Sequence, residues 1–367
     1  MKTHSQMPRT AWIYPTLAIL LFVATSIPGL GIGFTQSAVG TVFAVVLLVI
    51  LFGTVFAAVH HAEVIAERIG EPYGTLLLTM AVTIIEVALI VTIMLGESGL
   101  PTLARDTVFA VVMIVCNGLV GICIMVGGLR YREQGFQITG VNVYLCVLIV
   151  LATITLILPN YTLTTPGPLY SGSQLVFISI ATIILYSVFL YTQTIRHQDY
   201  FVAGDDVADS DHAIASGKLL AISAALLVVS LLAVVLLAKK FSLVVDAGAA
   251  AIGAPPAFAG VIVALLILLP ESVAAIGAAR RNDLQKSINL ALGSSLATIG
   301  LTVPAVATAT YILGKPLILG LSPRDMVLLV MTTLVSMMTF GTGRTNIMFG
   351  LVHLVVFAMF IFLVLVP

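Results

Sequence analysis

The chain has 367 residues, of which 60% are hydrophobic and only 9% are charged, and its formal net charge is zero. Soluble domains carry about 25% charged residues, so the composition excludes an ordinary soluble domain, and the balanced charge argues against a nucleic-acid partner. We therefore expect an all-α polytopic protein of the lipid bilayer. The cysteines Cys116, Cys123 and Cys146 lie in apolar runs without metal-ligand spacing, so we expect them to be buried and predict no cofactor.

The first residues combine a basic start with an apolar run, a pattern shared with secretory signal peptides. No small-residue cleavage site follows, and another apolar run begins almost at once. We therefore interpret residues 1–36 as an N-terminal segment with a retained first membrane span.

Apolar runs long enough to cross a bilayer recur along the whole chain. A helix needs about 20 apolar residues to span the hydrocarbon core, and lipid leaves no other way to satisfy the backbone of runs too long for barrel strands. On this criterion we predict eleven transmembrane helices, at residues 12–33, 38–59, 73–95, 107–128, 141–158, 174–194, 219–238, 256–279, 288–313, 325–341 and 347–366.

Basic residues are distributed unevenly between the two sides that these spans define. With a cytoplasmic N-terminus, the inner segments hold eleven of them: Lys2, Arg9, Arg68, Arg130, Arg132, Arg196, Lys218, Arg280, Arg281, Lys286 and Arg344. The outer segments hold five: Arg105, Lys239, Lys240, Lys315 and Arg324. The positive-inside rule favours this orientation, which places the C-terminus on the periplasmic side after eleven crossings.

The two halves of the chain resemble each other. The stretches ERIGEP (67–72) and AAIGAP (250–255) share Ile-Gly-x-Pro, and each precedes a span with one acid, Glu86 or Glu271. The next span in each half carries a small, polar patch, CNGLVG (116–121) or GSSLAT (293–298). Because five spans per repeat is an odd number, we expect repeats 37–195 and 219–367 to be inverted, with 196–218 as an acidic cytoplasmic linker. Inverted repeats with a midplane binding site are typical of transporters.

Glu86 and Glu271 are the two acids, of sixteen, that lie well inside predicted spans, and no Lys or Arg lies deep enough to pair with them. An ionised carboxylate at a helix centre costs about 2.5–3.5 kcal/mol on insertion scales. Each glutamate must therefore hold a proton or bind a cation, and competition between the two is what antiport requires. A protonated glutamate that merely bonds a neighbouring helix is the structural alternative.

Oxygen atoms suited to a hard cation accompany the two glutamates. Thr79 and Thr83 share a helical face with Glu86, and Pro270, which lacks an N–H, frees the Leu266 carbonyl one turn before Glu271. Calcium takes six to eight oxygen ligands, and the same oxygens could hold sodium, although hydroxyls on membrane helices also serve packing. The hydroxyl stripe is Ser294, Thr298 and Thr302, and the complete predicted cation-binding set is Glu86, Glu271, Asn117, Ser294, Ser295, Thr83 and Leu266.

Four stretches carry a family resemblance: HAEVIAERIGEPYGTLLLTMAVTIIEVALI (61–90), NGLVGICIMVGG (117–128), PESVAAIGAARRNDLQKSINLALGSSLATIGLTVP (270–304) and GRTNIMFGLVHL (343–354). They resemble the calcium/cation antiporter superfamily, and within it the ChaA-type bacterial calcium–proton and sodium–proton antiporters. The resemblance covers most of the chain and implies a bacterial inner-membrane protein whose two repeat glutamates bind cation or proton alternately. Wider calcium–proton exchangers carry Gly-Asn before each glutamate, whereas this chain has AVTIIE and ILLPE, so the choice between calcium and sodium stays open.

We therefore expect an antiporter that exports Ca²⁺, with Na⁺ or K⁺ as further substrates, in exchange for protons by alternating access. The glutamates are expected on two broken or irregular spans that meet near the midplane. A cation channel, a uniporter or a symporter could use the same acids, and a homo-oligomer is compatible with the sequence. An intramembrane enzyme is disfavoured, since the chain has no HExxH or GxSxG motif.

Further polar features stand apart from this set. The stretch GDDVADSDH (204–212) lacks the glycine and closing glutamate of an EF-hand, so it is either a solvated linker or, by resemblance, a peripheral cation sensor. His60 and His61 are expected at the inner end of the second span, as a pH sensor or as an interfacial pair. His353 is expected to be a satisfied core histidine, and residues 344–346 to anchor the last span.

Overall fold

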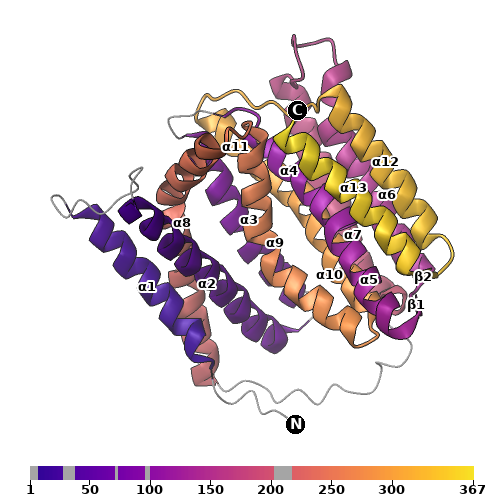
Figure 1. Cartoon of the computed structure of the whole chain (residues 1–367), viewed down its shortest axis with the longest axis horizontal. Coiled ribbons are helices and arrows are strands. Elements are labelled where there is room, and N and C mark those ends of the chain that lie inside the picture. The colour runs from indigo at the N-terminus through magenta and orange to yellow at the C-terminus, as the bar shows by residue number, and fades with distance from the viewer. Residues whose placement is uncertain (1–6, 28–37, 71–72, 96–99, 202–216) are drawn as a thin grey trace. The chain divides into compact units, whose positions relative to one another are not determined.

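The computed structural model describes residues 7–27, 38–70, 73–95, 100–201 and 217–367. Eleven helices among them are long and apolar enough to cross a membrane, which confirms the predicted number and the all-α class. They are α1 (Arg9–Ser26), α2 (Ala38–Ile69), α3 (Tyr73–Met94), α4–α5 (Leu103–Tyr131), α6 with its extension (Ile138–Tyr161), α7 with its extension (Gly172–Arg196), α8 (Gly217–Ile252), α9 (Ala257–Arg280), α10–α11 (Leu284–Ile312), α12 (Pro323–Phe340) and α13 (Ile347–Leu365) (Figure 1).

The chain divides into two compact units, and each is described by itself. The first comprises residues 1–100 and 209–253, and the second comprises residues 101–208 and 254–367. The first unit therefore combines α2 and α3 from the first predicted repeat with α8 from the second. Spatial clustering thus cuts across the sequence repeats, whose boundaries stay a prediction.

In the first unit, α2 is the central helix and packs against α1, α3 and α8. Gly53 lets α1 approach closely, because a Cβ there would lie 2.2 Å from the Tyr14 ring. Thr54 Oγ1 donates to the Tyr14 carbonyl (3.3 Å), and His61 Nε2 lies 3.0 Å from the Ala11 carbonyl. The His61 side chain is fully buried and α2 continues beyond it to Ile69, so the interfacial position of His60 and His61 stays a prediction.

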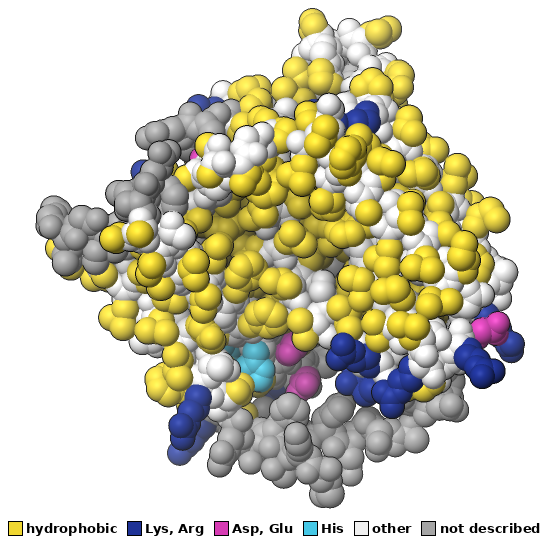
Figure 2. Space-filling model, in the orientation of Figure 1, with side chains coloured by type: hydrophobic (Ala, Val, Ile, Leu, Met, Phe, Trp, Pro, Cys, Tyr) yellow, Lys and Arg dark blue, Asp and Glu magenta, His cyan; other side chains and the backbone are white. Residues whose placement is uncertain are grey.

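In the second unit, the α4–α5 span is the core element, since 89% of the residues in an apolar 18-residue stretch of it are buried. It packs α4 (Leu103–Met113) against α9 and α5 (Val120–Tyr131) against α13. In the matching span of the second half, α10 (Leu284–Ala297) with α11 (Val303–Ile312), 67% of the residues in an apolar 18-residue stretch are buried. The visible surface is mostly hydrophobic, as expected for helices that face lipid (Figure 2).

The sequence patterns did not predict two features of the second unit. A short antiparallel pair joins β1 (Glu133–Gly135) to β2 (Arg344–Asn346), although no strand was predicted. Cys116 and Cys123 are buried as predicted, but Cys146 is exposed. The error has a simple cause: a membrane helix is apolar on all sides, so hydrophobicity does not separate its lipid face from its packed face.

Gly260 on α9 packs directly against the backbone of α4. A Cβ there would lie 2.7 Å from the Asp106 carbonyl carbon and 2.8 Å from the Thr107 nitrogen, both backbone atoms that cannot rotate away. We expect Gly260→Ala to lower the free energy of unfolding by about 1–3 kcal/mol, because the helices must separate.

Thermal unfolding of the purified protein measures this effect. Gly248→Ala on α8 is the matched control, since a Cβ there meets no atom within 4 Å. Because alanine is the better helix former by about 0.5–1 kcal/mol, the control should unfold at the same temperature or higher. Equal unfolding temperatures for both variants would contradict close packing at Gly260.

Candidate functional site

The first predicted ligand, Glu86, lies in the middle of α3. Its side chain is 1% exposed, and Thr83, one turn earlier, is 7% exposed, whereas Thr79 is half-buried. Thr83 and Glu86 thus both lie on the packed side of α3, which contacts α2 and α8 within the first unit. A buried carboxylate beside a hydroxyl provides oxygen ligands for a cation or a bonding partner for a proton.

The second predicted ligand, Glu271, lies on α9 in the second unit and is half-buried. Pro270 and Leu266 beside it are buried. The helix runs without interruption from Ala257 to Arg280, with Pro270 inside it. The prediction that the glutamates lie on broken or irregular spans is therefore not met, since α3 and α9 are both continuous α-helices. In α9, Pro270 removes a single backbone donor, and neighbouring helices can hold the helix together.

Irregular backbone occurs instead in the next span of each half. Residues Ile114–Leu119 between α4 and α5 are π-helical, and so are Thr298–Thr302 between α10 and α11. Two further π-helical segments, Thr153–Ile157 and Thr192–Arg196, lie toward the ends of their spans. π-helical turns are rare and occur frequently at functional sites, so their mid-span position in both halves marks the predicted polar patches.

The hydroxyl side chains of the second-half patch lie in its π-helical segment and in the turn before it. Ser294 and Ser295 lie in the last turn of α10, and Thr298 and Thr302 are the first and last residues of the π-helical segment. Ser295, Thr298 and Thr302 are buried, while Ser294 is half-buried. Ser295 Oγ donates to the Leu292 carbonyl at 2.8 Å, so its proton is committed to the helix and only its oxygen lone pairs are left to accept a further partner.

Asn117, in the first-half π-helical segment, joins a buried hydrogen-bond network. Its Nδ2 donates to Thr332 Oγ1 at 2.9 Å, and its Oδ1 lies 3.2 Å from His353 Nδ1. Since an amide oxygen can only accept, His353 Nδ1 carries the proton, and in the neutral ring Nε2 accepts from Thr339 Oγ1, 2.9 Å away. Asn117, Thr332, Thr339 and His353 are all buried.

This network changes the role expected of Asn117. Both ends of its amide are bonded to side chains of α12 and α13, so it connects three helical segments, and its oxygen is already shared with His353. The prediction that His353 is a satisfied core histidine is confirmed. Thr332 and Thr339 were missed, although their spacing of seven residues on an apolar span places them on one helix face.

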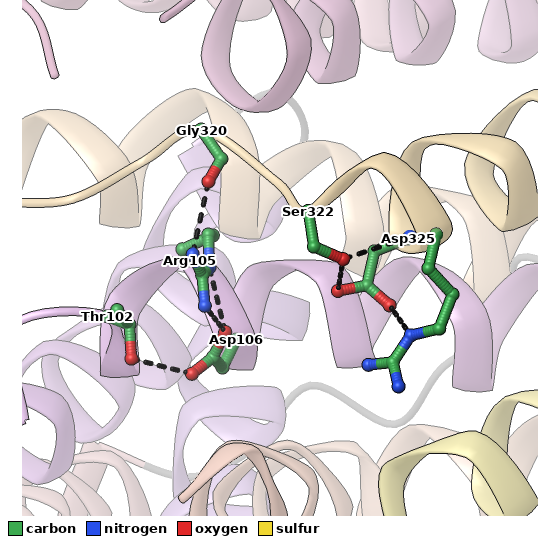
Figure 3. A network of polar contacts seen from close by, with 7 residues as sticks. Thr102, Arg105, Asp106, Gly320, Ser322 and Asp325 are labelled. Carbon is green, nitrogen blue, oxygen red and sulfur yellow. Dashed lines mark hydrogen bonds and ion pairs between the residues drawn. The ribbon is translucent and has the colours of Figure 1, made fainter. Parts of the chain in front are cut away.

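Carboxylates at the start of α4 and α12 are paired with arginines (Figure 3). Asp106 accepts from Thr102 Oγ1 and Arg105 Nε, both at 2.8 Å, and Arg105 also donates to the Gly320 carbonyl. Asp325 accepts from Ser322 Oγ at 2.7 Å and from Arg324 Nε at 3.2 Å. These two acids therefore have their charge balanced locally by an arginine.

Some of the remaining predicted features fall outside the residues that the structure describes. The acidic stretch 204–212 lies outside the described residues. Asn346 caps α13 by accepting from the Met348 N–H at 3.0 Å, which confirms that residues 344–346 anchor the last span. Among the described residues, no three His, Cys, Asp or Glu side chains gather into a metal cluster.

Comparison with known proteins identifies the family. A family model described as sodium/calcium exchanger protein matches residues 12–195 and 222–366, in both halves of the chain. The chain belongs to this family. Members of the sodium/calcium exchanger family transport ions across membranes, so the chain is an ion antiporter of the calcium/cation superfamily and not an enzyme, as the resemblance implied.

Individual exchanger relatives agree with this assignment. The provisionally named ionic transporter y4hA of Sinorhizobium fredii is 45% identical over 295 residues, 80% of each chain. The sodium-potassium/proton antiporter ChaA of Escherichia coli is 37% identical over 293 residues, 79% of each chain. The solved structure of native YfkE matches 97% of this chain and 100% of its own, with a TM-score of 0.73 and 19% identity, which supports the exchanger fold alone.

Proposed function

We propose that this exchanger-family protein is a secondary cation/proton antiporter that exports Ca²⁺, and Na⁺ or K⁺, in exchange for protons. The observation that carries the proposal is one glutamate inside a span of each half, Glu86 and Glu271, in a chain that the family model matches in both halves. Proton coupling is favoured by the antiporter ChaA, whose name specifies sodium, potassium and protons. Calcium is favoured by a 24% identical Ca²⁺/H⁺ antiporter of Aphanothece halophytica.

The proposed mechanism is alternating access with competitive binding. A carboxylate in a low-dielectric site is stable when it is protonated or neutralised by a cation, so the glutamates carry either ion and never both. Thr83, Ser294, Ser295 and the Leu266 carbonyl supply further oxygens, and Asn117 contributes through its remaining lone pair. The orientation places the N-terminus in the cytoplasm of a bacterial cell and the C-terminus in the periplasm.

Proton-coupled flux from reconstituted protein tests the proposal. Liposomes loaded with a pH indicator receive Ca²⁺, Na⁺, K⁺ or, as a control cation, choline on the outside. We expect the first three, in an order that the assay establishes, to drive protons outward with the membrane potential clamped, and choline to have no effect. Cation flux that moves charge without protons would indicate a channel or uniporter, and cation and proton movement in one direction would indicate a symporter.

A further inference from the structure

Three segments distant in sequence are held together at one end of the second unit. The β1–β2 pair joins residues 133–135 to 344–346. The buried Gln134 Nε2 donates to the Ala279 carbonyl (3.2 Å) and to Asn282 Oδ1 (3.0 Å), and the Tyr131 hydroxyl donates to the Arg280 carbonyl (3.0 Å). The end of α5, the α9–α10 turn and the start of α13 therefore form one fixed surface.

Basic side chains dominate this surface, which we call the basic platform. Its six members are all exposed, and they are Arg130, Arg132, Arg280, Arg281, Lys286 and Arg344. Acidic residues in the same segments number two, Glu133 and Asp283, and Asp283 Oδ1 is committed to capping α10 by accepting from the Lys286 N–H at 2.9 Å. Figure 2 shows Lys and Arg side chains gathered at the margin of the hydrophobic surface where the β1–β2 pair lies.

The positive charge of the platform is not balanced within the described chain. Ion pairs in the described chain include Arg105–Asp106 and Arg324–Asp325, both at helix starts that the predicted topology places on the other side of the membrane. None of the six platform residues takes part in them. An arginine that remains without a carboxylate within the described part of the chain is available to an anion from outside the chain.

The composition and borders of the platform indicate what that anion is. The positive-inside rule, which orients a protein in the membrane, requires only positive charge, so lysine would serve as well as arginine. Five of the six platform residues are nevertheless arginine, whose planar guanidinium binds phosphate through two parallel hydrogen bonds. Large apolar side chains border them, Leu129 at 69% exposure and Met348 at 64%, and such a mixture of arginines and apolar groups suits the boundary between hydrocarbon and headgroups. The backbone of the platform is also unusual. Arg132 and Asn282 are the non-glycine residues with positive φ in the described chain, at 68° and 66°. Positive φ costs conformational energy, and the packing around the platform maintains it.

We propose that the basic platform binds the phosphate-bearing headgroups of anionic phospholipids. Basic surfaces beside transmembrane helices on the cytoplasmic side are suited to such headgroups, and the exposed Leu129 and Met348 side chains would contact the acyl chains of the same lipid. This inference does not depend on the transported ion or on Glu86 and Glu271.

Lipid binding to the full-length protein tests the proposal. The protein is placed in bilayers of phosphatidylcholine with increasing phosphatidylglycerol, and retained phosphatidylglycerol is measured by native mass spectrometry and by displacement of a fluorescent analogue. The test variant is Arg281→Gln with Arg344→Gln, whose side chains make no hydrogen bond or ion pair within the described residues. The matched control, Lys239→Gln with Lys315→Gln, removes two exposed charges elsewhere.

We expect the test variant to bind phosphatidylglycerol roughly tenfold or more weakly, given the contribution of each basic side chain at an anionic surface, and added salt to weaken the wild type. The control should bind as the wild type does. Equal binding of phosphatidylglycerol and phosphatidylcholine, or equal losses in both double variants, would overturn the proposal. A quadruple variant with asparagine at Asp205, Asp206, Asp209 and Asp211 provides one more test. If lipid bound to this variant and not to the wild type, the acidic stretch would be the ligand of the basic platform, and the proposal would be overturned.

Discussion

Glutamine at position 86 or at position 271 should reduce proton-coupled cation flux to the level of protein-free liposomes. Glutamine matches glutamate in size and keeps its hydrogen-bonding capacity, but it neither titrates nor carries the negative charge that offsets a bound cation. The measurement is cation-driven proton movement in reconstituted liposomes. Asp199→Asn, which neutralises an exposed carboxylate at the start of the predicted linker, is the matched control and should retain full flux.

The same substitution separates ion binding from the structural alternative. A glutamate that only donates a hydrogen bond to a neighbouring helix is permanently protonated, and glutamine is a close neutral substitute for it. The structural alternative therefore predicts that Glu86→Gln and Glu271→Gln remain active. Aspartate at either position keeps the charge on a shorter side chain, so partial flux with an altered cation preference is expected. Full activity in either glutamine variant would refute the assignment of that residue.

The number and positions of the spans could be predicted because lipid imposes a length and an apolar composition on any helix that crosses it. Helix lengths could not be predicted in the same way. The seventh span was predicted at 219–238, yet α8 continues to Ile252 through Lys239, Lys240 and Asp246. Hydropathy indicates where a helix leaves the lipid, not where the helix itself ends. The charged residues of α8 therefore do not mark its end, and one of them, Lys240, donates from Nζ to the Thr25 carbonyl of α1 at 3.5 Å.

The candidate site could be predicted in part. Glu86 and Glu271 stand out because a charge inside an apolar run is costly and therefore rare. Irregular backbone was expected in the two spans that carry the glutamates, but it lies at Ile114–Leu119 and Thr298–Thr302. Pro304 follows the second segment and cannot donate to the Gly300 carbonyl, a signal that the prediction did not use, whereas no proline or charge marks the first segment. A π-helical turn inserts one residue, and it depends on the packing of neighbouring helices that hydropathy does not record.

The network around Asn117 yields the second large expected effect. His353→Leu removes both the donor to Asn117 Oδ1 and the acceptor for Thr339 Oγ1, leaving polar groups buried without partners. We expect the free energy of unfolding to fall by about 1–3 kcal/mol, the cost of an unsatisfied buried group. Asn117→Leu should cost a similar amount or less, because the His353 Nδ1–H and the Thr332 oxygen both lose their Asn117 partner, while the Thr332 hydroxyl still donates to Met113 Sδ at 3.4 Å. Thermal unfolding of purified protein in one detergent measures both.

Combining the two substitutions shows whether the cost belongs to the bond. In the double variant both partners are apolar, so neither is stranded, and the loss should be smaller than the sum of the single losses by about 0.6–1.7 kcal/mol. Ser336→Ala is the matched control. Ser336 lies on α12, the helix that carries Thr332 and Thr339, it is 1% exposed, and its hydroxyl has no hydrogen-bond partner in the described structure. Removing that hydroxyl should leave stability unchanged or raise it. Strictly additive losses for Asn117→Leu and His353→Leu would mean that the two side chains stabilise the second unit separately, by packing, and that the amide does not join α12 and α13.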